Sequence, residues 1–212
     1  MRTDELVQAL VADRATAEPP LGPQFAWALG IGLVLSAIGF FLVLGPRADI
    51  AWAAGTVRFD VKIGVVVLLA AAAFALVLQI GRPVPARRWR VVALAAAPVL
   101  LLIAVSAELF AVPSSQWLVR LVGTNSRVCL TAIPLMSVPL LAAFIIVLRR
   151  GAPASGTVAG AVAGLAASGL AAVLYATHCP DDSPLFVAVW YPIAIGGVTL
   201  AGALLGRFFL RW

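Results

Sequence analysis

The chain has 212 residues, of which 63% are hydrophobic and only 11% are charged, and its mean hydropathy is +1.06. Soluble domains carry roughly 45–50% apolar and about 25% charged residues, so this composition excludes a water-soluble globule. The formal net charge is +6. Because the basic residues lie in short gaps between apolar runs, they are typical of membrane topology signals and do not favour direct binding of nucleic acid.

Residues 1–23 precede the first long apolar run and predict a cytoplasmic leader. Thr3 is a good helix N-cap, and the acidic pair that follows it suits the positive end of a helix dipole. Apolar residues then recur on one helical face, and prolines 19, 20 and 23 form a stiff spacer. This pattern fits a peptide that docks in a partner's groove, and it fits a frayed tail on the membrane equally well. The candidate docking residues are Thr3, Asp4, Leu6, Val7, Leu10, Val11 and Asp13.

Six apolar runs then follow, each long enough for a helix that crosses a hydrocarbon core of ~30 Å, which takes about 20 residues. The chain is therefore predicted to be all-α, with residues 24–212 forming an integral membrane bundle of six transmembrane helices in the lipid bilayer. The spans are expected at residues 25–44, 63–81, 91–111, 128–148, 156–178 and 184–206.

The basic residues predict which way the bundle is oriented. If the N-terminus is cytoplasmic, ten basic residues lie inside and five lie outside, as the positive-inside rule favours. An even number of spans then places both termini in the cytoplasm, and the expected location is the bacterial inner membrane. The five outside residues would be Arg47, Arg58, Lys62, Arg120 and Arg127.

The two cysteines are expected at the outer face, where Cys129 begins the fourth span and Cys179 ends the fifth. The ends of neighbouring antiparallel helices allow a disulfide, and the outer side of the membrane is oxidising. A structural disulfide, a redox- or metal-sensing pair and inert thiols all remain open. Adjacent side chains add ligand types that suit a soft metal, so transient heavy-metal binding would use Cys129, Cys179, His178, Asp181 and Asp182. No resident cofactor is expected.

Small residues recur every four positions in the last two spans. Such ridges allow helix backbones to approach closely, because lipid supplies no hydrophobic drive between helices. Packing inside the bundle is the favoured interpretation, and a homodimer interface is the alternative. The glycines concerned are Gly156, Gly160, Gly164, Gly202 and Gly206.

Glu108 is the only acidic residue well inside a predicted span. Intramembrane carboxylates are costly and often functional, but the favoured explanation is that Glu108 reaches the interface or pairs with Arg120 or Arg127. The sequence contains no HExxH motif and no evident Ser–His–Asp arrangement or inverted repeat. We therefore expect the protein to act by binding and not as an enzyme.

Several motifs resemble one protein family. The stretch from His178 to Tyr191, which opens with HCPDDSP, resembles the signature of the NrsF family, the membrane anti-sigma factors described as negative regulators of sigma F. The sequence TDELVQALVAD at residues 3–13 is similar to the short leader of that family. Further similarities are Pro20–Leu21, the LGPR turn after the first span, Cys129 with the later IPL, and LRRGAP at residues 148–153. The resemblance covers essentially the whole chain.

The resemblance implies a repressor that holds an extracytoplasmic-function sigma factor at the inner membrane until a heavy metal or an oxidant is sensed. The paired cysteines of the family correspond here to Cys129 and Cys179, and the leader becomes the expected sigma-binding segment. Chemistry at the cysteines would then shift spans four and five and weaken that hold. The alternatives are a membrane thiol-disulfide oxidoreductase, which would need more than one cysteine pair for its relay, and a small transporter.

Overall fold

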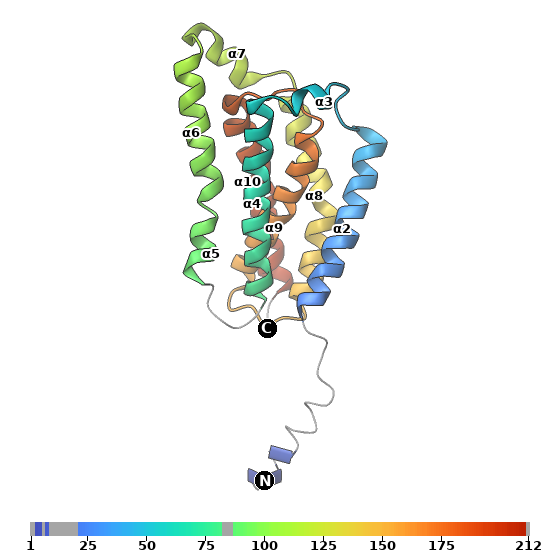
Figure 1. The fold of residues 1–212 in the computed structure, drawn as a ribbon. Coiled ribbons are helices and arrows are strands. Elements are labelled where there is room, and N and C mark those ends of the chain that lie inside the picture. Colours follow the sequence, from blue (N-terminus) through green and yellow to red (C-terminus); the bar gives the residue numbers. More distant parts are fainter. Residues whose placement is uncertain (1–2, 6, 9–20, 82–86, 211–212) are drawn as a thin grey trace.

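A computed structural model describes residues 3–5, 7–8, 21–81 and 87–210, and these residues form helices and turns without any strand. Six helical segments among them are long and apolar enough to cross a membrane, which confirms the prediction of an all-α bundle with six spans (Figure 1). The spans are α2 (Leu21–Val43), α4 (Val57–Ile80), α5 (Arg88–Ala93) with α6 (Ala96–Ala111), α8 (Ser126–Leu148), α9 (Gly156–Ala176) and α10 (Pro184–Phe209). The short helices α3 (Ile50–Ala53), η2 (Ser114–Gln116) and α7 (Trp117–Val122) lie between spans.

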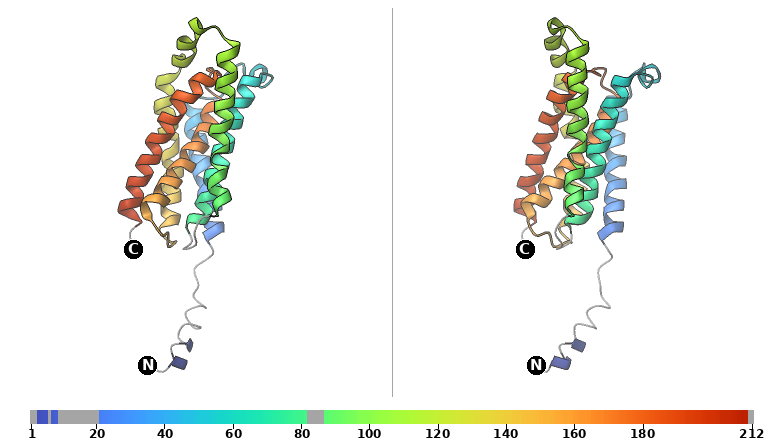
Figure 2. Two further views of the ribbon diagram at one scale, coloured as in Figure 1. Left: turned by 90° about the vertical axis from the view of Figure 1, so that its left-hand side faces the viewer. Right: turned by 60° about the vertical axis from the view of Figure 1, so that its left-hand side comes forward.

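Helix α9 forms the centre of the bundle. It packs against α10, α4 and α8, and its many alanines are buried. Helix α2 lies at the edge against α8, and α6 lies at another edge against α4 and α10 (Figures 1 and 2). These two outer helices expose large apolar side chains, as expected for surfaces in contact with lipid: Trp27, Phe41, Leu102 and Phe110.

The glycine ridges of the last two spans face each other. A Cβ on Gly160 would overlap the carbonyl oxygen of Gly202 and lie 2.7 Å from Cα of Gly206. A Cβ on Gly164 would lie 2.6 Å from the carbonyl oxygen of Val198. The backbones of α9 and α10 are therefore in direct contact inside the bundle, and no side chain larger than hydrogen fits between them.

Several helix bounds differ from the expected ones, and one span and one loop differ in their interior. Helix α2 begins at Leu21 and includes Pro23. The first turn of a helix tolerates proline, because the backbone N–H groups of that turn have no partner within the helix. Helix α4 begins at Val57, where the Thr56 side chain caps it by accepting from the Phe59 amide at 3.4 Å. The third span is interrupted at residues 94–95, because Pro98 has no N–H to donate to the carbonyl four residues before it. The expected loop at residues 112–127 contains η2 and α7.

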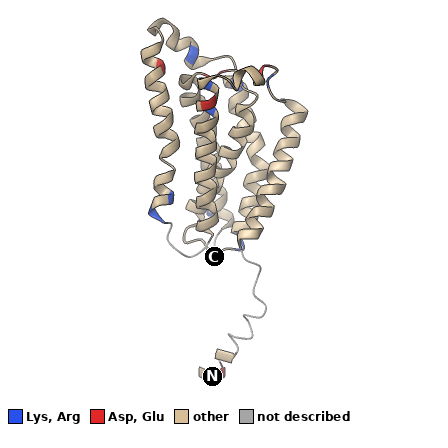
Figure 3. Ribbon diagram, in the orientation of Figure 1, with Lys and Arg blue, Asp and Glu red and all other residues tan. Residues whose placement is uncertain are grey.

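The two ends of the bundle differ in charge (Figure 3). We call the end that carries α3, α7 and the loop of residues 177–183 the polar end. There, five acidic residues lie with five basic ones. The opposite end, where α2 begins and α10 ends, is called the basic end. Among the described residues from 21 onward it holds no acidic residue but six arginines: Arg87, Arg88, Arg90, Arg149, Arg150 and Arg207.

Candidate functional site

The two cysteines lie together at the polar end. Cys129 is in the first turn of α8 and Cys179 follows the end of α9, and both thiols are free and fully buried. They belong to one apolar cluster with Tyr175 and Tyr191, whose ring centroids are 5.9 Å apart. The structure therefore brings together the two thiols that the sequence singled out and shields both of them from water.

An ionic clamp holds the loop that carries Cys179. Lys62, the only lysine of the chain, is 1% exposed, donates to the carbonyl oxygen of Cys179 at 2.8 Å and forms an ion pair with Asp182. The second carboxylate oxygen of Asp182 accepts from Arg47 at 2.7 Å. A buried ammonium is tolerable only with such partners. Through these contacts the clamp of Lys62, Asp182 and Arg47 joins α4 to the backbone beside the thiol.

The other polar residues of the HCPDDSP block also have structural partners. The Asp181 carboxylate accepts from the backbone amides of Thr124 at 3.0 Å and Asn125 at 2.8 Å, just before α8. Nδ1 of His178 lies 2.8 Å from the carbonyl oxygen of Gly45, at the turn after α2. The Ser183 hydroxyl caps α10 by accepting from the Leu185 amide. The block thus fixes the loop to α2, α8 and α10.

These contacts separate the residues that were expected to bind a metal. His178 faces a carbonyl, Asp181 faces amides and Asp182 faces two cations. Within the described part of the chain no group of three or more His, Cys, Asp or Glu side chains is arranged to hold a metal ion. The structure therefore does not form the expected five-ligand set, because three of its members are engaged in holding the loop. The two thiols lie in the same apolar cluster.

Burial also sets the reactivity of the loop thiol. Removal from water raises the pKa of Cys179 above its ordinary value, and the positive charge of Lys62 offsets part of that rise. The thiolate is the reactive form, so Cys179 in this closed arrangement reacts slowly at neutral pH. On the exposed side of the clamp, the hydrogen bond from Arg47 lowers the pKa of Asp49.

A second ionic cluster surrounds Glu108 of α6. Its carboxylate is 4% exposed and accepts from Arg58 of α4 at 3.0 Å and from Arg120 of α7 at 2.8 Å. The pairing with Arg120 was expected, whereas the pairing with Arg58 was not. Ser183 also donates to this carboxylate at 3.3 Å. The cluster therefore attaches α6 and α7 to the start of α10, beside the clamp.

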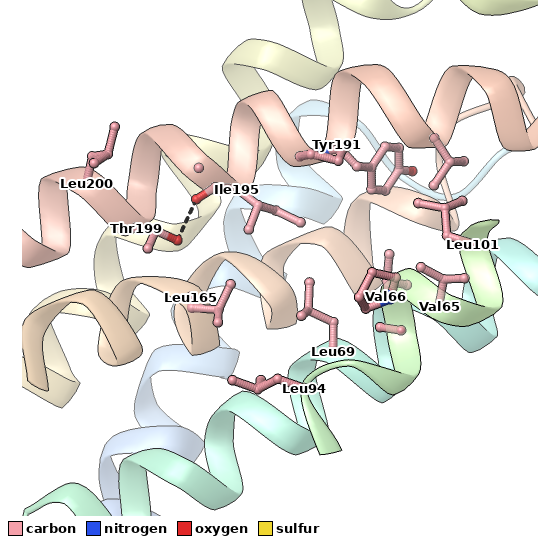
Figure 4. A pocket seen from close by; sticks show the side chains of 15 residues that line it. Val65, Val66, Leu69, Leu94, Leu101, Leu165, Tyr191, Ile195, Thr199 and Leu200 are labelled. Atoms are coloured by element: carbon pink, nitrogen blue, oxygen red, sulfur yellow. Dashed lines mark hydrogen bonds between the residues drawn. The ribbon is translucent and has the colours of Figure 1, made fainter. Parts of the chain in front are cut away.

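The cluster that holds the thiols borders a pocket on its α6 side. A pocket of about 540 Å³ lies between α4, α6, α9 and α10, and its lining includes Val66, Leu101 and Tyr191 (Figure 4). The Tyr191 hydroxyl is buried and makes no hydrogen bond within the described part of the chain.

The described leader residues, 3–5 and 7–8, precede α2, which begins at the basic end (Figure 1). Thr3, Asp4 and Val7 are helical and exposed, as a docking helix requires. The remaining predicted docking residues, Leu6, Leu10, Val11 and Asp13, lie outside the described residues.

Fold and site together define a polytopic, all-helical membrane protein whose polar end holds a buried thiol pair under an ionic clamp. Residues 10–212 match the family described as NrsF, negative regulator of sigma F. The chain is 33% identical to the probable anti-sigma-F factor NrsF of Azospira oryzae and 34% identical to the anti-sigma-F factor NrsF of Caulobacter vibrioides, in each case over the full length of both chains. No solved structure matches it. The chain therefore belongs to the NrsF family, which confirms the resemblance seen in its motifs.

Proposed function

We propose that this chain is an inner-membrane anti-sigma factor that binds an extracytoplasmic-function sigma factor through its leader. It releases the sigma factor when metal or oxidant stress in the periplasm acts on Cys129 and Cys179. Family membership over residues 10–212, with relatives named as anti-sigma-F factors, supports a sigma factor as the partner. The observation that carries the sensing step is the burial of both cysteines in one cluster, at the opposite end from the leader.

The charge of the two ends supports the orientation. Among the described residues from 21 onward, the basic end holds six arginines and no acidic residue, which favours it as the cytoplasmic end. The leader, which precedes α2 at that end, then faces the cytoplasm and its transcription machinery. The thiols face the periplasm, where oxidants and metal ions arrive first.

Helix α8 offers a direct connection between the two ends. Cys129 lies in its first turn, and Arg150, just beyond its other end, donates to Gln24 in the first turn of α2 at 3.3 Å. Close-packed interiors transmit a displacement because they cannot absorb it locally. A group added at the thiols would therefore move α8 and change how α2 presents the leader.

Helix α4 offers a second connection. Lys62 near its polar end holds the carbonyl oxygen of Cys179, and Gly81 after its other end accepts from the Ala152 amide at 3.3 Å. The two connections meet at the basic end, in the loop after α8. A tenfold loss of affinity for the sigma factor needs a difference of only ~1.4 kcal/mol between the two states.

The docking step is tested by pulling down the sigma factor with solubilised protein. Burying a leucine in a partner is worth ~1.5–3 kcal/mol, so Leu6→Ala combined with Leu10→Ala should weaken binding by orders of magnitude. Gln8→Ala, on the polar face of the same helix, is the matched control. If the double variant bound as well as the control, the leader would not be the docking segment.

The sensing step is tested by transcription from a promoter that depends on the sigma factor. Cys129→Ser and Cys179→Ser should each insert into the membrane at the wild-type level yet change the response to an added metal or oxidant. Wild-type induction in both single variants would refute a sensing role for the thiols.

A further inference from the structure

A groove at the basic end runs between α2 and α8. Its volume is about 440 Å³, and its walls are mainly apolar side chains of the two helices. Its polar residues, Gln24 and Arg150, lie at one end, whereas Ile31 and Ala143 are seven positions further into the span on their helices. At 1.5 Å per residue the groove reaches ~10 Å along the span. The lining residues are Gln24, Trp27, Ala28, Ile31, Ala143, Ile146, Val147 and Arg150.

The Arg150 guanidinium, at the mouth of this groove, has N–H donors available for a ligand. Its side chain donates to Gln24 at 3.3 Å, and no carboxylate of the described residues forms an ion pair with it. A guanidinium carries five N–H donors in a planar fork that matches phosphate oxygens. Trp27, which is exposed beside it, is a side chain typical of the membrane interface.

We propose that this groove binds one anionic phospholipid. The lipid phosphate accepts hydrogen bonds from Arg150, and an acyl chain lies along the apolar walls toward Ile31 and Ala143. A soluble phosphate compound would leave those walls without an occupant. The ammonium group of a zwitterionic lipid would find no carboxylate at this end among the described residues from 21 onward. An anionic lipid is therefore the better match.

The proposal goes beyond the anti-sigma function and does not depend on it. The occupied groove would join α2 to α8 one turn after α2 begins, through contacts to both helices. The bound lipid would thus fix the start of the helix that follows the leader. Lipid binding is measured without a sigma factor, so its failure is distinguishable from a failure of the docking hypothesis.

Native mass spectrometry of the full chain, titrated with phosphatidylglycerol or with phosphatidylcholine of the same acyl chains, tests this site. We expect one phosphatidylglycerol to bind more tightly than phosphatidylcholine. Arg150→Gln should weaken phosphatidylglycerol binding about tenfold to hundredfold, the range for losing a hydrogen bond to a charged group. Ala143→Phe, which fills the groove, should weaken binding of both lipids.

Arg149→Gln is the matched control, because Arg149 immediately precedes Arg150, is also exposed and does not line the groove. It removes the same charge and should leave the affinity for phosphatidylglycerol unchanged. An equal loss in the two arginine variants, or equal binding of the two lipids to wild type, would overturn the proposal. Competition by soluble glycerol 3-phosphate would overturn the choice of a lipid as the ligand.

Discussion

Replacing Lys62 with methionine should expose the loop thiol. The variant keeps an apolar stem of similar length but removes the ammonium that holds both the carbonyl oxygen of Cys179 and the Asp182 carboxylate. Hydrogen bonds to charged groups contribute about 1.5–3 kcal/mol each. Since Arg47 still holds Asp182, we expect the free energy of opening the loop to fall by about 2–4 kcal/mol.

The assay is the rate at which a maleimide modifies Cys179 in the folded protein, in a Cys129→Ala background. A fall of about 2–4 kcal/mol makes the open loop roughly 30-fold to 1,000-fold more populated, and the rate should rise in proportion. Arg127→Met is the control, because Arg127 is exposed in the first turn of α8 and lies outside the clamp. An unchanged rate in Lys62→Met would refute the argument that the clamp closes the thiol site.

Gly160→Ala should lower the free energy of unfolding of the detergent-solubilised protein by about 1–3 kcal/mol, because the new Cβ would overlap α10. In the control Gly196→Ala the new Cβ meets no atom within 4 Å, so its melting temperature should stay at the wild-type value. Equal melting temperatures for the two variants would contradict the packing of α9 against α10. Since burial raises the pKa of Cys179, its modification rate should keep rising with pH beyond about 8.5, where an ordinary cysteine levels off; a plateau at the ordinary pKa would contradict this. Reporter fusions after Gly151 should be active in the cytoplasm, and fusions at Asp182 should be active in the periplasm; the reverse would invert the orientation.

Much of the fold was predictable because hydropathy alone dictates where helices cross a membrane. The predicted boundaries were wrong where polar residues belong to a span. Helix α4 begins at Val57 and not near residue 63, because Lys62 and its neighbours extend the helix and find partners in other segments. Helix α7 is too short to leave a periodic pattern.

The arrangement of the site was predictable only in part. The sequence placed both cysteines at one end, because consecutive spans must be antiparallel. It did not predict the clamp, since Lys62 and Asp182 are 120 positions apart and no local pattern joins them. The available signals were a single lysine and a single acid inside a span, and each proved to be the buried centre of an ion-pair cluster. The metal-ligand expectation rested on residue types that are close in sequence, whereas in the structure His178, Asp181 and Asp182 face different partners.

The most direct test of the central claim is the affinity of the nanodisc-embedded protein for its sigma factor, measured before and after the thiols react with Hg²⁺ or diamide. Modification should raise Kd at least about tenfold, which corresponds to ~1.4 kcal/mol, and the combined variant Cys129→Ser, Cys179→Ser should show no change under the same treatment. An equal Kd for the reduced and the modified wild-type protein would contradict control of sigma-factor binding by the buried thiols.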